Sequence, residues 1–121
     1  MVIRALILTA LTSVCIIVSV LRAQEGDGFF STIDDLPIMQ GLHEAPETIA
    51  TFDTPAGRII EVYAEGESMT WLQVSRFYEQ TLPQLGWAKG GHNRYRREGE
   101  RLHIELIGKQ PLTIRITLAP E

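Results

Sequence analysis

The 121-residue sequence contains few of the side chains that most often carry chemistry. Its single cysteine, Cys15, lies inside an apolar N-terminal run, so the rest of the chain has no thiol, disulfide or thiolate metal site. Its three histidines, His43, His92 and His103, have neither the i+4 nor the hairpin spacing of a metal site. No segment matches a catalytic motif. We therefore expect a protein that is not an enzyme and that holds no metal or other cofactor.

Positive charge is in the minority and is unevenly spread. The chain has 11 Lys and Arg against 15 Asp and Glu, a net charge of −4. Residues 24–67 hold ten acids and a single base, Arg58, whereas five cations fall within the thirteen residues 89–101. The phosphate backbone of nucleic acid repels a chain of net negative charge, so we expect no binding to nucleic acid.

The N-terminus resembles an export signal. Residues 5–21 form an uncharged apolar run that follows Arg4, the charge order of an exported N-terminus. Residues 1–23 are either a signal peptide cut near Ala23 or an uncleaved membrane anchor, since the run rises about 25 Å and falls slightly short of a full span. Either alternative predicts a domain outside the cytoplasm, periplasmic or held at the inner membrane. Lipid attachment at Cys15 is disfavoured by the bulky Val14.

One small domain is expected after this segment. Residues 24–35 contain two glycines and no hydrophobic period, which predicts a linker. Within it, Phe29 and Phe30 either cap the edge of the domain or, if the anchor is retained, rest at the membrane interface. Residues 36–121 are long enough for a single domain and too short for two.

The hydrophobic pattern of this domain predicts a two-layer α+β fold. Two strand-like runs flank the turn residues 54–57, and strict alternation over 101–107 and 112–118 predicts further strands with one buried face. Between them, apolar residues at helical spacing follow Ser68, the expected N-cap, and end at Pro83 and Gly86. The expected order is ββαβββ, an antiparallel sheet with one helix packed on one face. The apolar helical positions are Trp71, Val74, Tyr78, Leu82 and Leu85.

The cations of residues 89–101 are the strongest candidate for a binding surface. An exposed basic hairpin can bind lipid headgroups, an acidic glycan or an acidic protein. The alternative is that its arginines pair with nearby glutamates and only protect a sheet edge. Phe77 lies beside the apolar stripe, so we expect it to be an exposed aromatic. The candidate surface comprises Lys89, Arg94, Arg96, Arg97, Arg101 and the neighbouring His103.

Residues 36–121 also resemble a family of small exported bacterial envelope proteins with no assigned activity. The resemblance rests on segments such as ATFDTPAGRIIE, VSRFYEQTLPQLGW and YRREGERLHIEL. It implies a location in the cell envelope and implies no functional residue.

Together these features predict a non-enzymatic envelope module that binds a protein or an anionic membrane surface. The alternative is a small-ligand-binding or enzymatic domain, with a cleft between helix and sheet that uses Tyr63, Tyr78 and His103. The sequence carries no signal for an oligomeric state.

Overall fold

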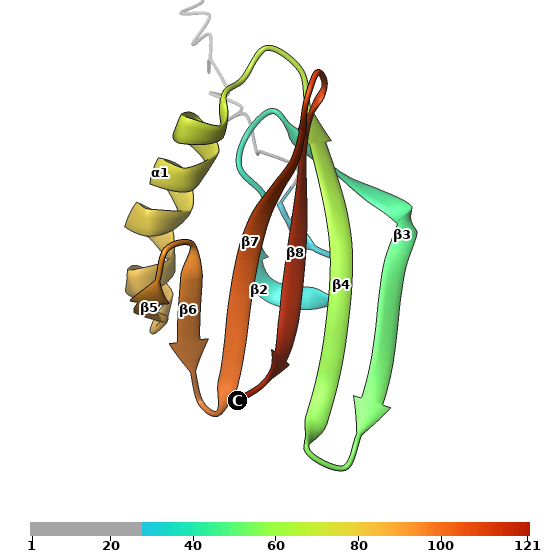
Figure 1. Cartoon of the computed structure of the whole chain (residues 1–121), viewed down its shortest axis with the longest axis vertical. Coiled ribbons are helices and arrows are strands. Elements are labelled where there is room, and N and C mark those ends of the chain that lie inside the picture. Colours follow the sequence, from blue (N-terminus) through green and yellow to red (C-terminus); the bar gives the residue numbers. More distant parts are fainter. Residues whose placement is uncertain (1–27) are drawn as a thin grey trace, which may run out of the picture.

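The structure of the protein is a computed structural model that describes residues 28–121. The predictions for residues 1–23, including Cys15, lie outside the described residues. The described part is a mixed α+β fold, as the sequence predicts, with one α-helix, a six-stranded antiparallel sheet and a two-stranded sheet (Figure 1).

The six-stranded sheet is built from four hairpins and has the strand order β3-β4-β8-β7-β6-β5. Four strands follow the helix, so the expected order ββαβββ is one strand short. The edge strand β5 is short, with only four residues, all of them exposed. The bounds are β3 Leu42–Thr54, β4 Gly57–Gly66, β5 Ala88–Gly91, β6 Arg94–Arg97, β7 Glu100–Lys109 and β8 Leu112–Pro120.

Alternation along the central strands forms the core, as the sequence predicts. The inward residues of β4 are Ile60, Val62 and Ala64, all at most 2% exposed. On β7 and β8 the inward positions are likewise apolar, and the outward ones are mostly Arg, His, Glu or Thr. Each strand therefore has one dry and one wet face. The buried residues of β7 and β8 are Leu102, Ile104, Leu112, Ile114, Ile116 and Leu118, together with Ala119.

The second layer contains the helix α1 (Trp71–Thr81), the 3₁₀ turn η1 (Leu82–Leu85) and a hairpin of β1 (Phe29–Phe30) and β2 (Ile33–Pro37). Six strands span about 24 Å, whereas a helix is about 10 Å wide, so α1 alone cannot cover the sheet. The hairpin covers the remainder behind β8 and β4 (Figure 1). Residues 28–35 thus belong to the folded domain, and the predicted linker is wrong there.

The side chains of this hairpin explain the error. Phe30, Ile33 and Leu36 are each 1% exposed and belong to the same core cluster as the sheet, whereas Phe29 is exposed. These apolar residues stand among glycines and acids, and the two strands are too short to display a period. Neither of the two roles predicted for the Phe pair describes Phe30, which is a core residue.

The N-cap of α1 is Thr70, and the prediction of Ser68 is wrong. Thr70 has an extended backbone, its hydroxyl accepts from the Gln73 N–H at 3.3 Å, and the Gln73 side chain accepts from the Thr70 N–H at 2.8 Å. This reciprocal pair is a capping box. Ser68 has a positive φ of 55°, a turn conformation that precedes the helix.

The end of the helix agrees with the sequence. The α-helix ends at Thr81, Pro83 lies in the following 3₁₀ turn, and Gly86 closes it with a left-handed φ of 88°. Trp87 then enters the core at 2% exposure. Of the predicted stripe, Val74, Tyr78 and Leu82 are buried; the remaining two members, Trp71 and Leu85, are partly buried and exposed, respectively.

Candidate functional site

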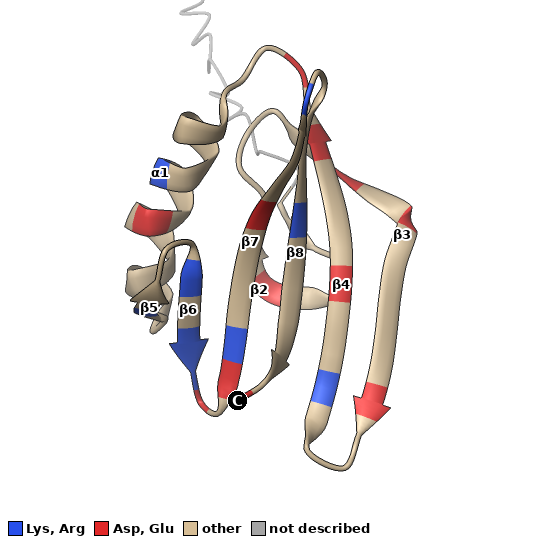
Figure 2. Cartoon of the chain, in the orientation of Figure 1, with Lys and Arg blue, Asp and Glu red and all other residues tan. Residues whose placement is uncertain are grey.

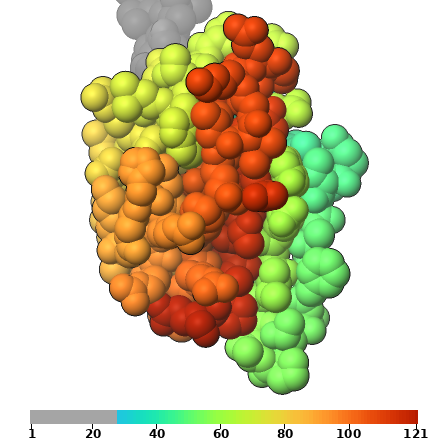
Figure 3. All heavy atoms as spheres, viewed as in Figure 1, coloured from blue at the N-terminus to red at the C-terminus, as the bar shows by residue number. Residues whose placement is uncertain are grey.

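Within residues 28–121, no element packs on the opposite face of the six-stranded sheet, and Figure 3 views this face directly. We call it the open face. Its basic part comes from the hairpin of β6 and β7, which is closed by Glu98 and Gly99 with φ of 50° and 76°. Two positive φ values in a two-residue loop are typical of the hairpin turn that matches strand twist. The tight turn fixes which residues of β6 face outward.

Four basic side chains project together from this hairpin. Tyr95 of β6 is buried at 1% exposure, so its neighbours Arg94 and Arg96 point to the open face. Across the ladder, Arg94 is opposite His103, and Arg96 is opposite Arg101. Directly opposite residues have Cβ atoms about 5 Å apart, and next-but-one residues on a strand lie about 7 Å apart. We call Arg94, Arg96, Arg101 and His103 the basic tetrad.

The tetrad surrounds a shallow depression of about 620 Å³ on the open face. Thr117 and Ala119 of β8 also line it, beside His103 and Arg101 in the register. Both residues are small compared with their long neighbours, which is why the surface is hollow there. Thr117 adds a hydroxyl that can donate a hydrogen bond. The depression therefore presents arginine side chains at its walls and a floor of small residues, with one hydroxyl, to any group that enters it.

Few carboxylates of the protein neutralise the positive charges of the arginines in the tetrad. In the described part of the chain neither Arg94 nor Arg101 forms an ion pair with a carboxylate, and Arg96 has only a 3.6 Å contact to the side chain of Glu121. This differs from the alternative in which the hairpin arginines merely pair with adjacent glutamates. Glu100 binds Arg58 on β4, and Glu105 binds Arg115 on β8.

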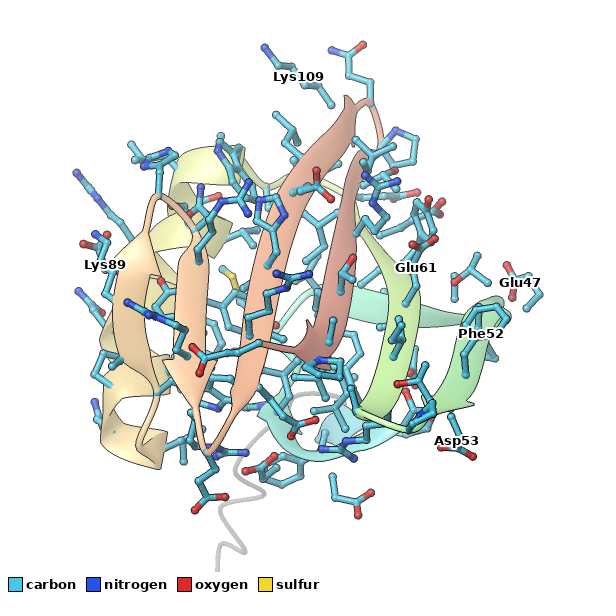
Figure 4. The ribbon with its side chains drawn as sticks, turned by 60° about the horizontal axis from the view of Figure 1, so that its bottom comes forward. Glu47, Phe52, Asp53, Glu61, Lys89 and Lys109 are labelled. Atoms are coloured by element: carbon cyan, nitrogen blue, oxygen red, sulfur yellow. The ribbon has the colours of Figure 1, made fainter. Side chains whose placement is uncertain are left out.

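Two of the predicted surface cations lie elsewhere. Lys89 projects to the helix side and binds Glu79 at 2.8 Å, and Figure 4 places it beyond the outer edge of β5. Arg97 lies 4.3 Å from the centre of the Trp87 ring and forms an ion pair with Asp35 of β2. The candidate surface of six residues is therefore reduced to the four of the tetrad.

The environment of His103 favours its neutral form. Burial lowers the pKa of His103, and the positive charge of Arg94 lowers it further. The nearest carboxylate, Glu105, is 3.7 Å from Nδ1 and is held by Arg115 at 2.8 Å, so it offsets these effects only in part. An anion in the depression would favour the protonated form instead.

The residues of the alternative cleft do not converge. Tyr78 is in the core, where its hydroxyl donates to the carbonyl of Pro37 at 2.9 Å and burial raises its pKa. Tyr63 and His103 belong to the open face, on the other side of the sheet. Phe77 is half-buried and packs edge-on against Tyr78 at 4.9 Å, which differs from the exposed aromatic that we expected.

The floor of the depression was not predicted from the sequence. Thr117 is an ordinary outward residue of an alternating strand, and only the pairing of β8 with β7 brings it beside His103.

Among the described residues, no group of three or more His, Cys, Asp or Glu side chains could hold a metal ion. No helix of residues 28–121 is long and apolar enough to cross a membrane.

Comparisons with protein-family models, with curated proteins and with solved structures found no match. The resemblance to exported envelope proteins therefore stays an expectation, and the open face is the feature of the described residues that bears on function.

Proposed function

We propose that the protein is a non-enzymatic binding module of the cell envelope that holds an anionic partner on its basic tetrad. In this proposal residues 1–23 deliver the chain to the envelope, and the open face makes the contact. The partner is an anionic surface, either an acidic envelope protein or the headgroups of the membrane.

The observation that carries the proposal is the pairing of Arg96 with Arg101, next to the pairing of Arg94 with His103. Like charges directly opposite on a sheet are destabilising. Among the described residues no carboxylate is bound to Arg94 or Arg101, so the Arg96–Arg101 pair, with Arg94 beside it on the same face, leaves repulsion that an external anion relieves. Arginine suits this role because its planar guanidinium can hold phosphate or carboxylate oxygens in a bidentate manner.

The test compares two triple variants of equal net charge. Arg94→Gln, Arg96→Gln and Arg101→Gln remove three charges from the tetrad. Arg76→Gln, Lys89→Gln and Lys109→Gln remove three from outside it. Inorganic polyphosphate is the probe, and its affinity for the full chain in nonionic detergent is measured at several salt concentrations. At about 1 kcal/mol per arginine near an anionic surface, the tetrad variant should bind roughly a hundredfold more weakly at low salt.

The control variant should bind nearly as tightly as the wild type. If both triples lose the same affinity, the binding is a general Coulombic effect and the proposal is wrong. A wild-type protein that does not bind polyphosphate would also refute it.

A further inference from the structure

One edge of the six-stranded sheet is formed by β3. Within residues 28–121 no strand pairs with the outer side of β3 (Figure 1). The unpaired backbone N–H and C=O groups of a long edge strand are a template for pairing with another strand. The opposite edge strand, β5, has only four residues, so β3, with thirteen, is the edge that can take a partner strand.

The second half of β3 lacks the features that usually protect a sheet edge. Such edges are commonly protected by Lys, by Pro or by a bulge. In β3 both Pro46 and the irregular register, between Ala45 and Ala50, belong to the first half. From Ala50 to Thr54 the register with β4 is regular. No Lys or Arg lies on β3 (Figure 2), and the only charge of its second half is Asp53.

This unprotected half is also exposed on both of its faces. Phe52 points to the open face, opposite Ile59, and is 61% exposed. Thr51 and Asp53 point to the other face and are exposed as well. Figure 4 shows Phe52 and Asp53 along β3, at the margin of the sheet. Because side chains of a strand are stabilised by cross-strand neighbours, Phe52 would gain from a second neighbour on the outer side.

A second copy of the same segment fits this edge. A two-fold axis normal to the sheet makes two β3 strands antiparallel and keeps the open faces of both copies on the same side. When the axis passes beside Phe52, this residue is opposite its own copy, and Thr51 is opposite Asp53. Ala50 is then opposite Thr54, so all five regular positions are paired and the irregular stretch lies outside the contact.

The chemistry of the pairs selects this register. The two Phe52 rings form an aromatic cross-strand pair. The Thr51 hydroxyl of each copy can donate a hydrogen bond to the Asp53 carboxylate of the other. An axis beside Asp53 would set two carboxylates directly opposite each other, which is destabilising. An axis beside Thr51 would place Phe52 opposite the small side chain of Ala50.

We infer that the protein forms a homodimer by antiparallel pairing of residues 50–54 of β3 about a two-fold axis at Phe52. The two sheets become one sheet of twelve strands, a size that open sheets can reach. Five residue pairs make a contact at or below the lower end of specific interfaces, roughly 600 Å² per partner, so the association is weak and reversible. The basic tetrad lies on β6 and β7, away from β3, so the dimer leaves it open and does not depend on the proposed function.

Disulfide formation between introduced cysteines tests the contact. All cysteine variants also carry Cys15→Ser, and the full chain is oxidised in nonionic detergent. In Phe52→Cys the two thiols are directly opposite, with Cα atoms about 5 Å apart, so covalent dimers should form roughly tenfold faster than in Leu72→Cys. Leu72 is a matched control because it is 57% exposed and lies on α1, outside the contact.

Two further variants test the register. Thr51→Cys and Asp53→Cys each place their own two thiols on diagonal positions, where Cα atoms are about 7–8 Å apart and beyond the usual reach of a disulfide. In an equimolar mixture, residue 51 of one copy is directly opposite residue 53 of the other. The mixture should therefore form covalent dimers several-fold faster than either variant alone, and equal rates would overturn the inference.

Sedimentation equilibrium of the full chain in nonionic detergent measures the association without a covalent bond. Phe52→Lys sets two like charges against each other at the axis, so its dimer should dissociate roughly tenfold more readily than that of the wild type. Leu72→Lys should dimerise as the wild type does. Residues 1–27 are the same in these three proteins, so association through them cannot distinguish the two lysine variants.

Three results would overturn the inference. The first is a wild-type protein that stays monomeric up to about 1 mM, a concentration at which even weak specific association is seen. The second is a Phe52→Lys variant that associates like the wild type. The third is oxidation that crosslinks Phe52→Cys no faster than Leu72→Cys. Polyphosphate binding by the tetrad is measured separately, so failure of the dimer leaves the proposed function standing.

Discussion

Arg96 of β6 and Arg101 of β7 are direct cross-strand partners on the open face of the sheet. Both are exposed, and neither is held by a close carboxylate in the described part of the chain. Sheet positions that serve only stability favour opposite charges or apolar pairs across a ladder. In the proposed function, the two positions would serve binding at some expense of stability.

Replacing Arg101 with Gln should consequently separate stability from binding. Removal of one charge relieves the repulsion with Arg96, so the free energy of unfolding should rise by a few tenths of a kcal/mol, a value limited by exposure to solvent. Affinity for polyphosphate should fall about fivefold to tenfold at low salt. Urea unfolding and a binding titration on the same preparation measure the two effects.

High salt offers a check on this explanation. Because salt screens exposed charges, the stability difference between wild type and Arg101→Gln should shrink above about 0.5 M salt. A variant that is less stable than the wild type at low salt would contradict the view that the pair is repulsive.

His103 gives the fold a dependence on pH that can be worked out in sign. Its pKa is lowered in the folded state, chiefly by burial and then by Arg94, so the unfolded chain takes up a proton first as the pH falls below about 6.5. Stability should therefore decline as the pH falls from about 7 through the lowered pKa and level off below it. His103→Gln should remove this decline. Urea unfolding at pH 7.5 and at steps down to pH 5 compares the two proteins.

Binding of polyphosphate should depend on pH in the direction opposite to stability. Because an anion in the depression favours protonated His103, affinity should increase as the pH falls over the same range, and less so in His103→Gln. Equal pH dependence of binding in both proteins would show that His103 does not face the ligand.

Much of the fold follows from the sequence because its signals are periodic. Alternation over 101–107 and 112–118, and the turn residues 54–57, predict strands that the structure contains. Short elements without a period were missed. The hairpin of β1 and β2 has strands of two and five residues, and its burial depends on the width of the sheet that it covers.

The site was harder to predict, because spacing in the sequence does not show on which face of the sheet a side chain lies until the strands and their pairing are known. Residues 89–101 appear as one basic cluster, yet Lys89 and Arg97 turn to the helix side while Arg94 and Arg96 turn to the open face. A regular two-residue alternation separates Arg96 from Arg97 once β6 is assigned. Thr117 lies beside His103 only because β8 pairs with β7 in that register, which the sequence alone does not give.

The capping box of α1 is testable by a pair of alanine substitutions. Thr70→Ala removes the acceptor for the Gln73 N–H and should lower the free energy of unfolding by about 1 kcal/mol. Ser68→Ala should have a smaller effect, since Ser68 lies before the cap and in a turn. Thermal or urea unfolding of both variants distinguishes them, and a larger loss at Ser68 would mean that the helix begins there, as the sequence suggested.

Arg97 joins three parts of the fold and should contribute to stability, unlike the tetrad. Its guanidinium stacks on Trp87, donates to the carbonyl of Leu85 at 3.0 Å and pairs with Asp35. The side chain is only 19% exposed, so these contacts are partly shielded from water. Arg97→Ala should lower the free energy of unfolding by roughly 1–3 kcal/mol, most of it from the stacking and the hydrogen bond. Polyphosphate binding should hardly change, because Arg97 is not in the tetrad.

Asp35→Asn measures the smaller, charge-dependent part of that contribution. The hydrogen bond and charge of Arg97 lower the pKa of Asp35, so the pair stabilises the fold above the ordinary carboxyl pKa near 4, and this stabilisation is lost as the pH falls through the lowered value. Because Asp35 is half-exposed, its loss at pH 7 should cost well under 1 kcal/mol. The variant should instead flatten the stability curve between about pH 5 and pH 2, measured by urea unfolding against the wild type. If the free energy of unfolding of the variant depends on pH in this range as it does in the wild type, Arg97 binds chiefly to Trp87 and Leu85. The strand β2 is then held to β6 by its apolar residues alone.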